Sequence, residues 1–337
     1  MKKSSRKRAG ARAPRGRPSV TGLSVVRQIE RVQSEAQEGD LAFGRGKSLH
    51  VSSLDKIFFE DPSITKGDVM RYYALVAPVL LPLLKDRPLI LKRYPNGISG
   101  PSFFQQNAGA HPPAVRVAEV ATEGERALRI IGGDLLTLLY TVQLGTIAVH
   151  PWQSRLPEID HADYSTIDLD PGKGVPFERI VELAERIRDE LEALELTAAL
   201  KTSGSRGLHI VLPMPTRTSY ARSAAIADRI ARRITDKFPR LATLERSLQQ
   251  RQPGTIYVDA KQNARGKSVA SAYSVRERPG APVSAPLRWN DLHSKLRIED
   301  FTIATMPRRL DSAGDLWGEA LKHRNAVRAI DRALENE

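Results

Sequence analysis

Two acidic residues end a β-like run at residues 166–172, where Asp168 and Asp170 stand two apart before a Pro-Gly turn. Side chains at i and i+2 of a strand leave the same face, about 6–7 Å apart at ~3.3 Å per residue. Two such carboxylates can share a pair of divalent metal ions, which can hold a triphosphate and activate a 3′-hydroxyl. Asp259 ends another predicted strand, on the face opposite Ile256 and Val258, and could complete the cluster. A lone Asp more often ends a strand or caps a turn.

The segment at residues 202–209 contains two glycines that permit tight backbone geometry, so that its amides can point into one concavity. Ser203, Arg206 and His209 add a hydroxyl, a planar cation and an imidazole, which suit phosphate oxygens. The alternative interpretation is a β-hairpin turn with a partly buried histidine. This segment therefore predicts a phosphate site only if the fold brings it close to Asp168 and Asp170.

Two further residues could meet a polyanion. His150 ends a predicted strand and could reach a phosphate or a sugar, although a histidine close to Trp152 is more often simply packed. Arg276 lies on the strand predicted after Asp259 and could face a polyanion, or lie at the surface of an edge strand.

Four residues are candidates for contact with nucleic acid. Phe103 and Phe104 are adjacent beside a Gly-rich loop and cannot both be buried on one strand face. An exposed Phe can stack on a nucleobase, which is worth ~1–3 kcal/mol. The alternative is one core Phe and one partly covered Phe. Lys56 and Lys66 stand ten residues apart, and either could be an ordinary solvated lysine.

Composition limits the class of protein. The chain has 337 residues, 41% hydrophobic and 27% charged, enough for a sizeable core. It has no cysteine, which excludes disulfides, thiolate metal sites and a cysteine nucleophile and agrees with a cytoplasmic location. No apolar run approaches the ~20 residues of a membrane span, so no membrane partner is expected. Eight of its thirteen excess positive charges lie in residues 1–18, which predicts a polycationic arm for a polyanion or a solubilising tail.

The elements that must position these residues follow from periodicity. Residues 1–43 are expected to be a disordered basic tail, with a short helix near 25–36, and the folded body should begin near residue 44. A helix capped near Thr65 should kink or end at Pro78. Helices are also predicted at residues 132–144, 177–194 and 220–238, and strands at 88–94, 146–150, 198–201, 208–212, 255–259 and 269–275. The alternation indicates an α+β (mixed α/β) fold with mixed sheets.

Taken in order, these segments resemble the polymerase domain of bacterial DNA-end-joining ligases of the ligase D type, in the archaeo-eukaryotic primase superfamily. The resemblance covers roughly residues 45–320. It rests on Asp55-Lys56, Thr65-Lys66-Gly67-Asp68, Phe103-Phe104-Gln105, His150-Pro151-Trp152, Asp168-Leu169-Asp170-Pro171, the run 203–209, Tyr273-Ser274-Val275-Arg276 and Pro279-Gly280-Ala281-Pro282. It implies a primase-like fold, with an N-terminal α/β module and an RRM-like catalytic module around a central cleft. Residues 44–322 would form this domain, with catalytic motifs within 150–276, and residues 323–337 a C-terminal helical extension.

The resemblance also implies roles. Asp168, Asp170 and Asp259 would hold two Mn²⁺ or Mg²⁺ ions, and the nucleotide would contact His150, Ser203, Arg206, His209 and Arg276. Phe103 and Phe104 would stack at the junction of template and downstream end, and Lys56 and Lys66 would grip a 5′-phosphate.

The predicted function is template-dependent addition of NTPs or dNTPs, with ribonucleotides preferred, at gaps or ends of DNA during non-homologous end joining. A Ku-type protein and a separate ATP-dependent DNA ligase are candidate partners that the sequence leaves open. Two alternatives stay open as well: a primase that starts chains without a primer, and a DNA-end-binding scaffold with a weak catalytic site.

Overall fold

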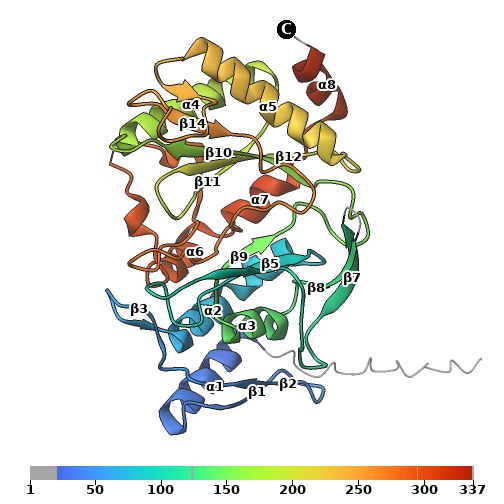
Figure 1. Ribbon diagram of the computed structural model, residues 1–337, viewed down its shortest axis with the longest axis vertical. Coiled ribbons are helices and arrows are strands. Elements are labelled where there is room, and N and C mark those ends of the chain that lie inside the picture. The colour runs from blue at the N-terminus through green and yellow to red at the C-terminus, as the bar shows by residue number, and fades with distance from the viewer. Residues whose placement is uncertain (1–20, 123–124, 294, 336–337) are drawn as a thin grey trace, which may run out of the picture.

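A computed structural model describes residues 21–122, 125–293 and 295–335. Two modules follow each other along the chain and stack on each other (Figure 1). The N-terminal module consists of α1 (Gly22–Glu35), β1 (Gly39–Ala42), β2 (Ser48–Val51), β3 (Ile57–Phe59), β4 (Ile64–Thr65), α2 (Lys66–Leu84), β5 (Leu89–Arg93), β6 (Phe103–Gln105), β7 (Val117–Thr122), β8 (Glu125–Ile130), α3 (Leu135–Gln143) and β9 (Thr146–Pro151). One continuous hydrophobic core runs through both modules.

The short helix predicted near residues 25–36 is confirmed as α1, but the prediction of a disordered tail over residues 1–43 is wrong for residues 21–43. Helix α1 is capped by Thr21, and Val25, Ile29 and Val32 are buried against the core. These residues recur at helical spacing and form one apolar face against α2, although the polar composition of the segment suggested disorder. The packing of that face stabilises the helix, so the folded body begins before residue 44. Residues 1–20 lie outside the described residues.

Helix α2 is the central helix of the N-terminal module. Thr65 caps it through a capping box, accepting a hydrogen bond from Asp68 N (3.1 Å) while Asp68 accepts one from Thr65 N (2.8 Å). Of the predicted kink or end at Pro78, the end does not occur: the helix continues past Pro78 and Pro82, because packing against α1 and α3 compensates for the missing backbone hydrogen bonds. By length and composition alone α2 could cross a membrane, but its buried residues place it in the protein core.

The C-terminal module is built on a six-stranded sheet. It consists of β10 (Tyr164–Pro171), α4 (Phe177–Ala193), β11 (Ala199–Thr202), β12 (Leu208–Pro213), α5 (Tyr220–Lys237), β13 (Ala242–Thr243), β14 (Ile256–Asp259), β15 (Pro286–Leu287), α6 (Met306–Ala313), α7 (Leu316–Lys322) and α8 (Val327–Glu335), with 3₁₀ turns at Trp289–Asp291 and Ile298–Asp300. The strand order is β13-β14-β10-β12-β11-β15, and only β13 and β14 pair in parallel. The βαββαβ order with β10 and β12 central is that of an RRM-like sheet.

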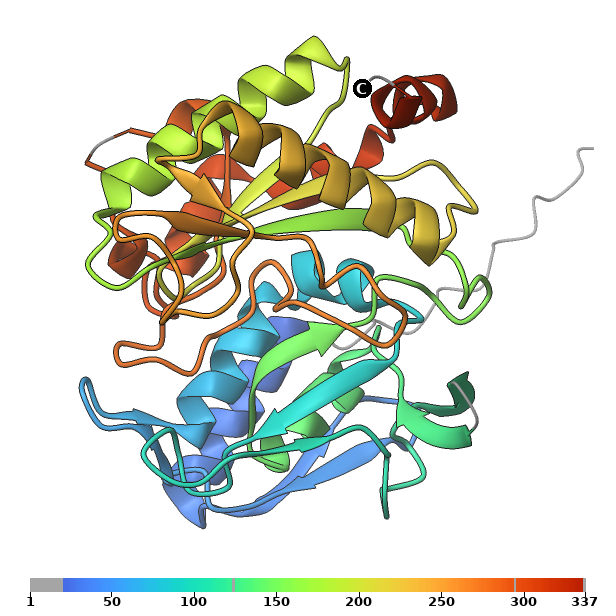
Figure 2. The same ribbon diagram turned by 45° about the horizontal axis from the view of Figure 1, so that its top comes forward.

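Helices α4 and α5 cover one face of this sheet, and the N-terminal module lies on its other side (Figures 1 and 2). Each helix buries one apolar stripe, as the periodicity predicts. On β10, the Ser165 hydroxyl donates to Ser223 O on α5, so odd-numbered residues face the helices. Asp168 and Asp170 therefore leave the opposite face, toward the N-terminal module.

The predicted strand at residues 269–275 does not form. Tyr273 has a left-handed backbone conformation (φ 64°), and Val275 makes one isolated bridge. Two buried tyrosines of α2 take the place of a partner strand: the Tyr72 hydroxyl donates to Tyr273 O (2.8 Å), and the Tyr73 hydroxyl accepts from Val275 N (3.1 Å). The segment before Arg276 is thus held by side chains of the N-terminal module.

The helix expected at the C-terminal end of the chain is α8. It packs against α5 and buries Ile330 completely. The Asn325 side chain ties the preceding segment to the backbone of Thr197 and Pro213. The helix is therefore part of the folded module. Residues 336–337 lie outside the described residues.

Candidate active site

Strand register brings the predicted acids together. Asp168 on β10 lies directly opposite Asp259 on β14 and directly opposite His209 on β12. His209 in turn lies opposite Lys201 on β11. Directly opposite residues of antiparallel strands share a face, with Cα atoms about 4.5–5.5 Å apart. Asp259, Asp168, His209 and Lys201 therefore form one row across the sheet, and Asp170 lies two residues further along β10.

Each acid is held by a protein partner. Asp168 Oδ1 lies 3.3 Å from His209 Nε2. Asp170 Oδ2 lies 3.2 Å from Arg251 Nη2. Asp259 accepts hydrogen bonds from Lys261 N (2.7 Å) and the Gln262 amide (2.9 Å). The three acids thus lie at neighbouring backbone positions of β10 and β14, but each carboxylate contacts its own protein partner.

The donor chemistry fits divalent metal ions. Carboxylate oxygens are the ligands that Mg²⁺ and Mn²⁺ prefer. Burial by itself would raise the pKa of Asp168, but the neighbouring His209, Lys201 and Arg276 hold it below its usual value, so this acid is ionised. Among the described residues, no three His, Cys, Asp or Glu side chains already form a metal cage. Binding an ion would take the carboxylates of Asp170 and Asp259 from their present partners.

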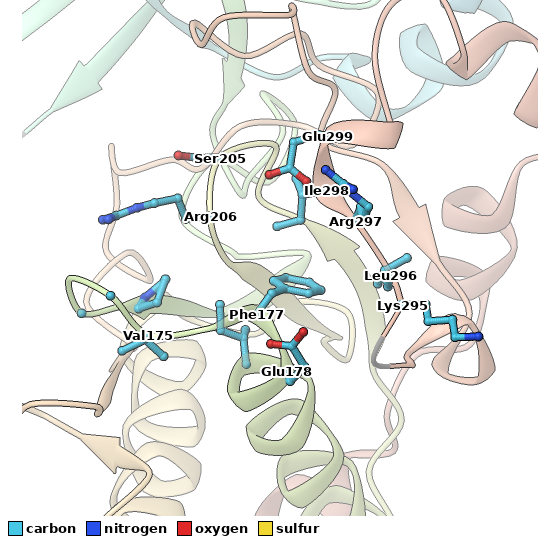
Figure 3. A pocket seen from close by; sticks show the side chains of 14 residues that line it. Val175, Phe177, Glu178, Ser205, Arg206, Lys295, Leu296, Arg297, Ile298 and Glu299 are labelled. Carbon is cyan, nitrogen blue, oxygen red and sulfur yellow. The ribbon is translucent and has the colours of Figure 1, made fainter.

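All five predicted nucleotide-binding residues line one cavity of about 270 Å³ together with two of the acids. They are His150, Ser203, Arg206, His209 and Arg276, which come from β9, β12 and the two segments that flank β12 and β15. The structure thus gathers positions separated by up to 126 residues of sequence around Asp168 and Asp170. A larger hollow of about 590 Å³ adjoins it, between the Ser205–Arg206 turn, the start of α4 and residues 295–299 (Figure 3). The smaller cavity is the candidate site because it contains the acids.

Close backbone approach fixes the turn at residues 203–207. A Cβ at Gly207 would lie 1.9 Å from Leu169 O, and Gly204 has φ 68° with the Arg276 side chain against it. The Ser203 hydroxyl accepts hydrogen bonds from Ser205 N and Gly207 N, each at 3.1 Å. These two amides are therefore occupied inside the turn, and do not open toward a phosphate as expected. The Ser203 carbonyl accepts a hydrogen bond from Arg276, which joins the turn to that guanidinium.

His150 is a half-buried, neutral imidazole. Burial, followed by the charge of Arg276, lowers its pKa to about 3. Its Nε2 atom is buried and has no hydrogen-bond partner among the described residues, although His150 lines the cavity. A buried polar atom without a partner inside a polar cavity is suited to a hydrogen bond with a ligand.

The predicted lysine pair is brought together by the β3–β4 hairpin, in which Lys66 N donates to Lys56 O (2.8 Å). The Lys56 ammonium donates to Asn96 Oδ1 (2.9 Å). Lys66 is only 5% exposed, and its ammonium donates to Ser52 O (2.6 Å). Burial, followed by the charge of Lys56, lowers the pKa of Lys66 to about 8. Lys66 is therefore a buried cation beside a solvated one, and its contact with a 5′-phosphate stays a prediction.

Phe103 and Phe104 on β6 are both exposed, by 48% and 65%. This excludes the alternative of one core Phe and one partly covered Phe. Arg93 lies over the Phe103 ring at 5.1 Å and Lys92 over the Phe104 ring at 5.8 Å. Exposed rings beside cations form a surface that suits stacked bases and phosphates.

A sequence model described as "LigD, primase-polymerase domain" matches residues 65–317. The chain belongs to this family. The primase-polymerase domain is 33% identical over 282 residues to the multifunctional non-homologous end joining protein LigD of Pseudomonas aeruginosa, which covers 81% of this chain and 33% of that protein. It is 34% identical to the bifunctional LigD protein of Bacillus subtilis, over 79% of this chain and 43% of that protein. The chain thus spans less than half the length of these relatives.

Among solved structures, the primase-polymerase domain resembles the polymerase domain of Mycobacterium tuberculosis ligase D in complex with DNA. The TM-score is 0.76 at 31% identity, over 82% of this chain and 99% of that chain. The expected family, the primase-like mixed α/β fold and the nucleotidyltransferase class are confirmed by these findings. The roles of individual residues stay predictions.

Sequence reasoning missed three residues of the primase-polymerase domain. Lys201 ends the acid row, Arg251 holds Asp170 and stacks on Tyr257 at 4.9 Å, and Glu277 pairs with Lys92 (3.1 Å). Lys201 had a sequence signal, because a lysine that ends a predicted apolar strand before a Gly-rich turn is unusual. Arg251 and Glu277 lie in irregular segments, where periodicity predicts no direction for a side chain.

Proposed function

We propose that this primase-polymerase domain adds nucleotides to a DNA 3′ end opposite a template, filling gaps or extending ends during non-homologous end joining. The supporting observation is one polar cavity that combines Asp168 and Asp170 with the five nucleotide-binding candidates, beside Asp259. LigD relatives are named as end-joining proteins, and the similar structure contains DNA.

Asp168, Asp170 and Asp259 are the residues that would hold two Mn²⁺ or Mg²⁺ ions. Such ions, when bound, lower the pKa of a 3′-hydroxyl and neutralise triphosphate charge. Arg206 and Arg276 would bind the triphosphate of an NTP or dNTP, since a guanidinium pairs well with phosphate oxygens. Ser203, His209 and His150 would add uncharged hydrogen bonds, since burial holds the pKa of His150 well below its usual value. Together these groups would stabilise charge that grows on the phosphates in the transition state.

The DNA would lie across the N-terminal module. Phe103 and Phe104 would stack on bases, and Lys56 with Lys66 would bind the 5′-phosphate of a gap or end. Residues 1–18 would add sequence-independent, salt-sensitive affinity for DNA. A preference for ribonucleotides, recruitment by Ku or a separate ATP-dependent ligase, and a cytoplasmic location at the nucleoid are parts of the same proposal.

The test is extension across a 5′-phosphorylated one-nucleotide gap, with Mn²⁺ or Mg²⁺ and with either NTPs or dNTPs. We expect Asp168→Asn to reduce extension at least about 100-fold, because metal ions contribute several kcal/mol to such a step. Asp189→Asn is the matched control, since Asp189 pairs with Arg188 on α4, which covers the opposite face of the sheet. Equal extension by wild type and Asp168→Asn would refute the assignment and favour an end-binding scaffold.

Two further experiments test whether the protein is a primase and whether the lysine pair recognises a 5′-phosphate. Synthesis on a template offered with only nucleoside triphosphates would indicate a primase. A Lys56→Ala/Lys66→Ala variant that keeps the wild-type preference for a 5′-phosphate would remove the end-gripping role.

A further inference from the structure

A largely buried acid beside the nucleotide cavity has no role in the proposed function. The side chain of Glu277 is only 12% exposed, and this residue follows Arg276 directly in the chain. Arg276 lines the cavity that would hold a triphosphate. A carboxylate so close to a triphosphate repels it, and burial adds a desolvation cost. An acid at this position must therefore contribute something that offsets both effects.

Glu277 bridges two cations that come from different modules. Its Oε2 atom lies 3.4 Å from Arg276 Nε, and its Oε1 atom accepts a hydrogen bond from Lys92 Nζ on β5 (3.1 Å). Burial alone would raise the pKa of the Glu277 carboxyl, but Arg276 and the other neighbours hold it well below its usual value, so the acid is ionised. Two cations and one anion still leave an excess of positive charge for a phosphate.

Each of the two cations makes a second contact that fixes its direction. Arg276 Nη1 donates to Ser203 O, so the protein holds Nε and Nη1, and the guanidinium can offer Nη2 to a ligand. Lys92 Nζ lies over the ring of Phe104, 5.8 Å from its centre. The carboxylate of Glu277 thus lies between the cation that faces the triphosphate site and the cation that lies against the proposed DNA-stacking ring.

We propose that Glu277 is a positioning residue shared by the two substrate sites. One carboxylate oxygen directs the guanidinium of Arg276 toward the triphosphate, and the other holds Lys92 against the Phe104 ring at the DNA surface. The inference rests on the proposed function for the identity of the two ligands, a nucleoside triphosphate and DNA. A glutamine at this position has one uncharged carbonyl oxygen and an NH₂ group that only donates, so it would weaken both contacts.

The direct test measures equilibrium binding of ATP with Mn²⁺, and separately of gapped DNA, to the full chain carrying Glu277→Gln. We expect the Kd for each ligand to rise at least about fivefold, the loss typical of a hydrogen bond between charged groups. A carboxylate that only repelled the ligands predicts the opposite sign, namely tighter binding of both by Glu277→Gln. Glu192→Gln is the matched control, since Glu192 pairs with Arg188 on α4, which covers the opposite face of the sheet.

Two double-mutant cycles separate positioning from a general loss of structure. In an Arg276→Met background, Glu277→Gln should no longer weaken ATP binding, because no guanidinium is left to direct, but it should still weaken DNA binding. In a Lys92→Met background the pattern should reverse. A purely structural acid predicts that Glu277→Gln weakens binding of both ligands equally in every background. That result, or tighter ATP binding by Glu277→Gln, would overturn the proposal.

The single variant Lys92→Met tests the proposal while the acid stays in place. It should raise the Kd for gapped DNA at least about fivefold and change the Kd for ATP by less than about twofold, since Glu277 still holds Arg276. An unchanged affinity for DNA would contradict the proposal. None of these measurements needs turnover, so a wild type that binds ATP and DNA but does not extend the gap would refute the proposed function alone.

Discussion

At the scale of single residues, burial decides which charges are available for chemistry. His150 is half-buried and neutral, Asp168 is half-buried and ionised because of its cationic neighbours, and Lys66 is a buried cation with a depressed pKa. None of these states follows from residue type alone. They follow from desolvation and from the partner that each group meets in the folded chain.

The pKa of Lys66, about 8, predicts a pH dependence of end recognition. Because this value lies below that of a free lysine, the ammonium is present below about pH 8 and is lost as the pH rises through it. The preference for a 5′-phosphate over a 5′-hydroxyl should therefore decrease above pH 8, by at most about tenfold per pH unit. This preference is measured as the ratio of the affinities for two DNA ends that differ only in a 5′-phosphate or a 5′-hydroxyl, between pH 6.5 and 9.5.

Lys66→Arg is the control for this dependence, because a guanidinium stays charged over the whole range. Its preference should be flat with pH. A wild-type preference that is equally flat would show that Lys66 does not contact the phosphate in its charged form.

The exposed ring of Phe104 predicts an effect on DNA affinity. Phe104→Ala should weaken binding of gapped DNA by about 5- to 150-fold, since one aromatic–base stack contributes ~1–3 kcal/mol. Val327→Ala is the matched control, because Val327 is 58% exposed but lies on α8, far along the chain from β6. Fluorescence anisotropy measures both, and an unchanged affinity for Phe104→Ala would remove the stacking role.

At the scale of elements, strand register explains which residues become neighbours, and buried apolar faces explain which helices form. The antiparallel pairing of β10 with β12 and β14 converts distant residues into neighbours on one face. Helix α1 shows the same dependence on packing, because its sequence is polar on average and only its buried face stabilises it.

The corrected start of the fold predicts a stability change in α1. Ile29→Ala should lower the free energy of unfolding by about 2–5 kcal/mol, because Ile29 is fully buried. Leu23→Ala on the same helix should change it by less than about 0.5 kcal/mol, since Leu23 is 62% exposed. Urea unfolding of the full chain measures both, and equal effects would mean that α1 does not pack as described.

At the scale of the whole molecule, the two modules meet at the segment before Arg276. The Tyr73 hydroxyl on α2 donates to Ile147 O of β9 (2.5 Å) and accepts from Val275 N (3.1 Å). The Ser274 hydroxyl accepts from Val149 N of β9 (2.8 Å). A residue of the nucleotide cavity is thus positioned by the module that carries the DNA-binding candidates.

Removing one of these contacts should therefore affect nucleotide binding from a distance. Tyr73→Phe leaves two buried backbone groups without a partner, so it should cost about 1–3 kcal/mol of stability and raise the nucleotide KM severalfold. Tyr140→Phe is the control, because its hydroxyl bonds Ala110 O inside the N-terminal module. It should leave KM unchanged, and a similar KM for both variants would argue against coupling between the modules.

The sequence alone determined the local structure and the types of chemical group. Helical and strand periodicity, the Thr65 cap and the Asp-x-Asp strand end depend on neighbours within a few residues, so they can be recognised along the chain. The order of the motifs along the chain is also enough to indicate the family. Lys201 is visible in the sequence as a lysine at a strand end, but its burial against His209 is not.

Only the tertiary structure decided which groups meet and in what state. The Asp259–Asp168–His209–Lys201 row depends on pairing among four strands, and the irregular path of residues 269–275 depends on hydroxyls from α2, more than 190 residues away. These contacts are long-range and are fixed by the sum of core packing, which local patterns do not contain. Burial then shifts the pKa values of the ionisable side chains, because a group loses its hydration only when the folded chain surrounds it.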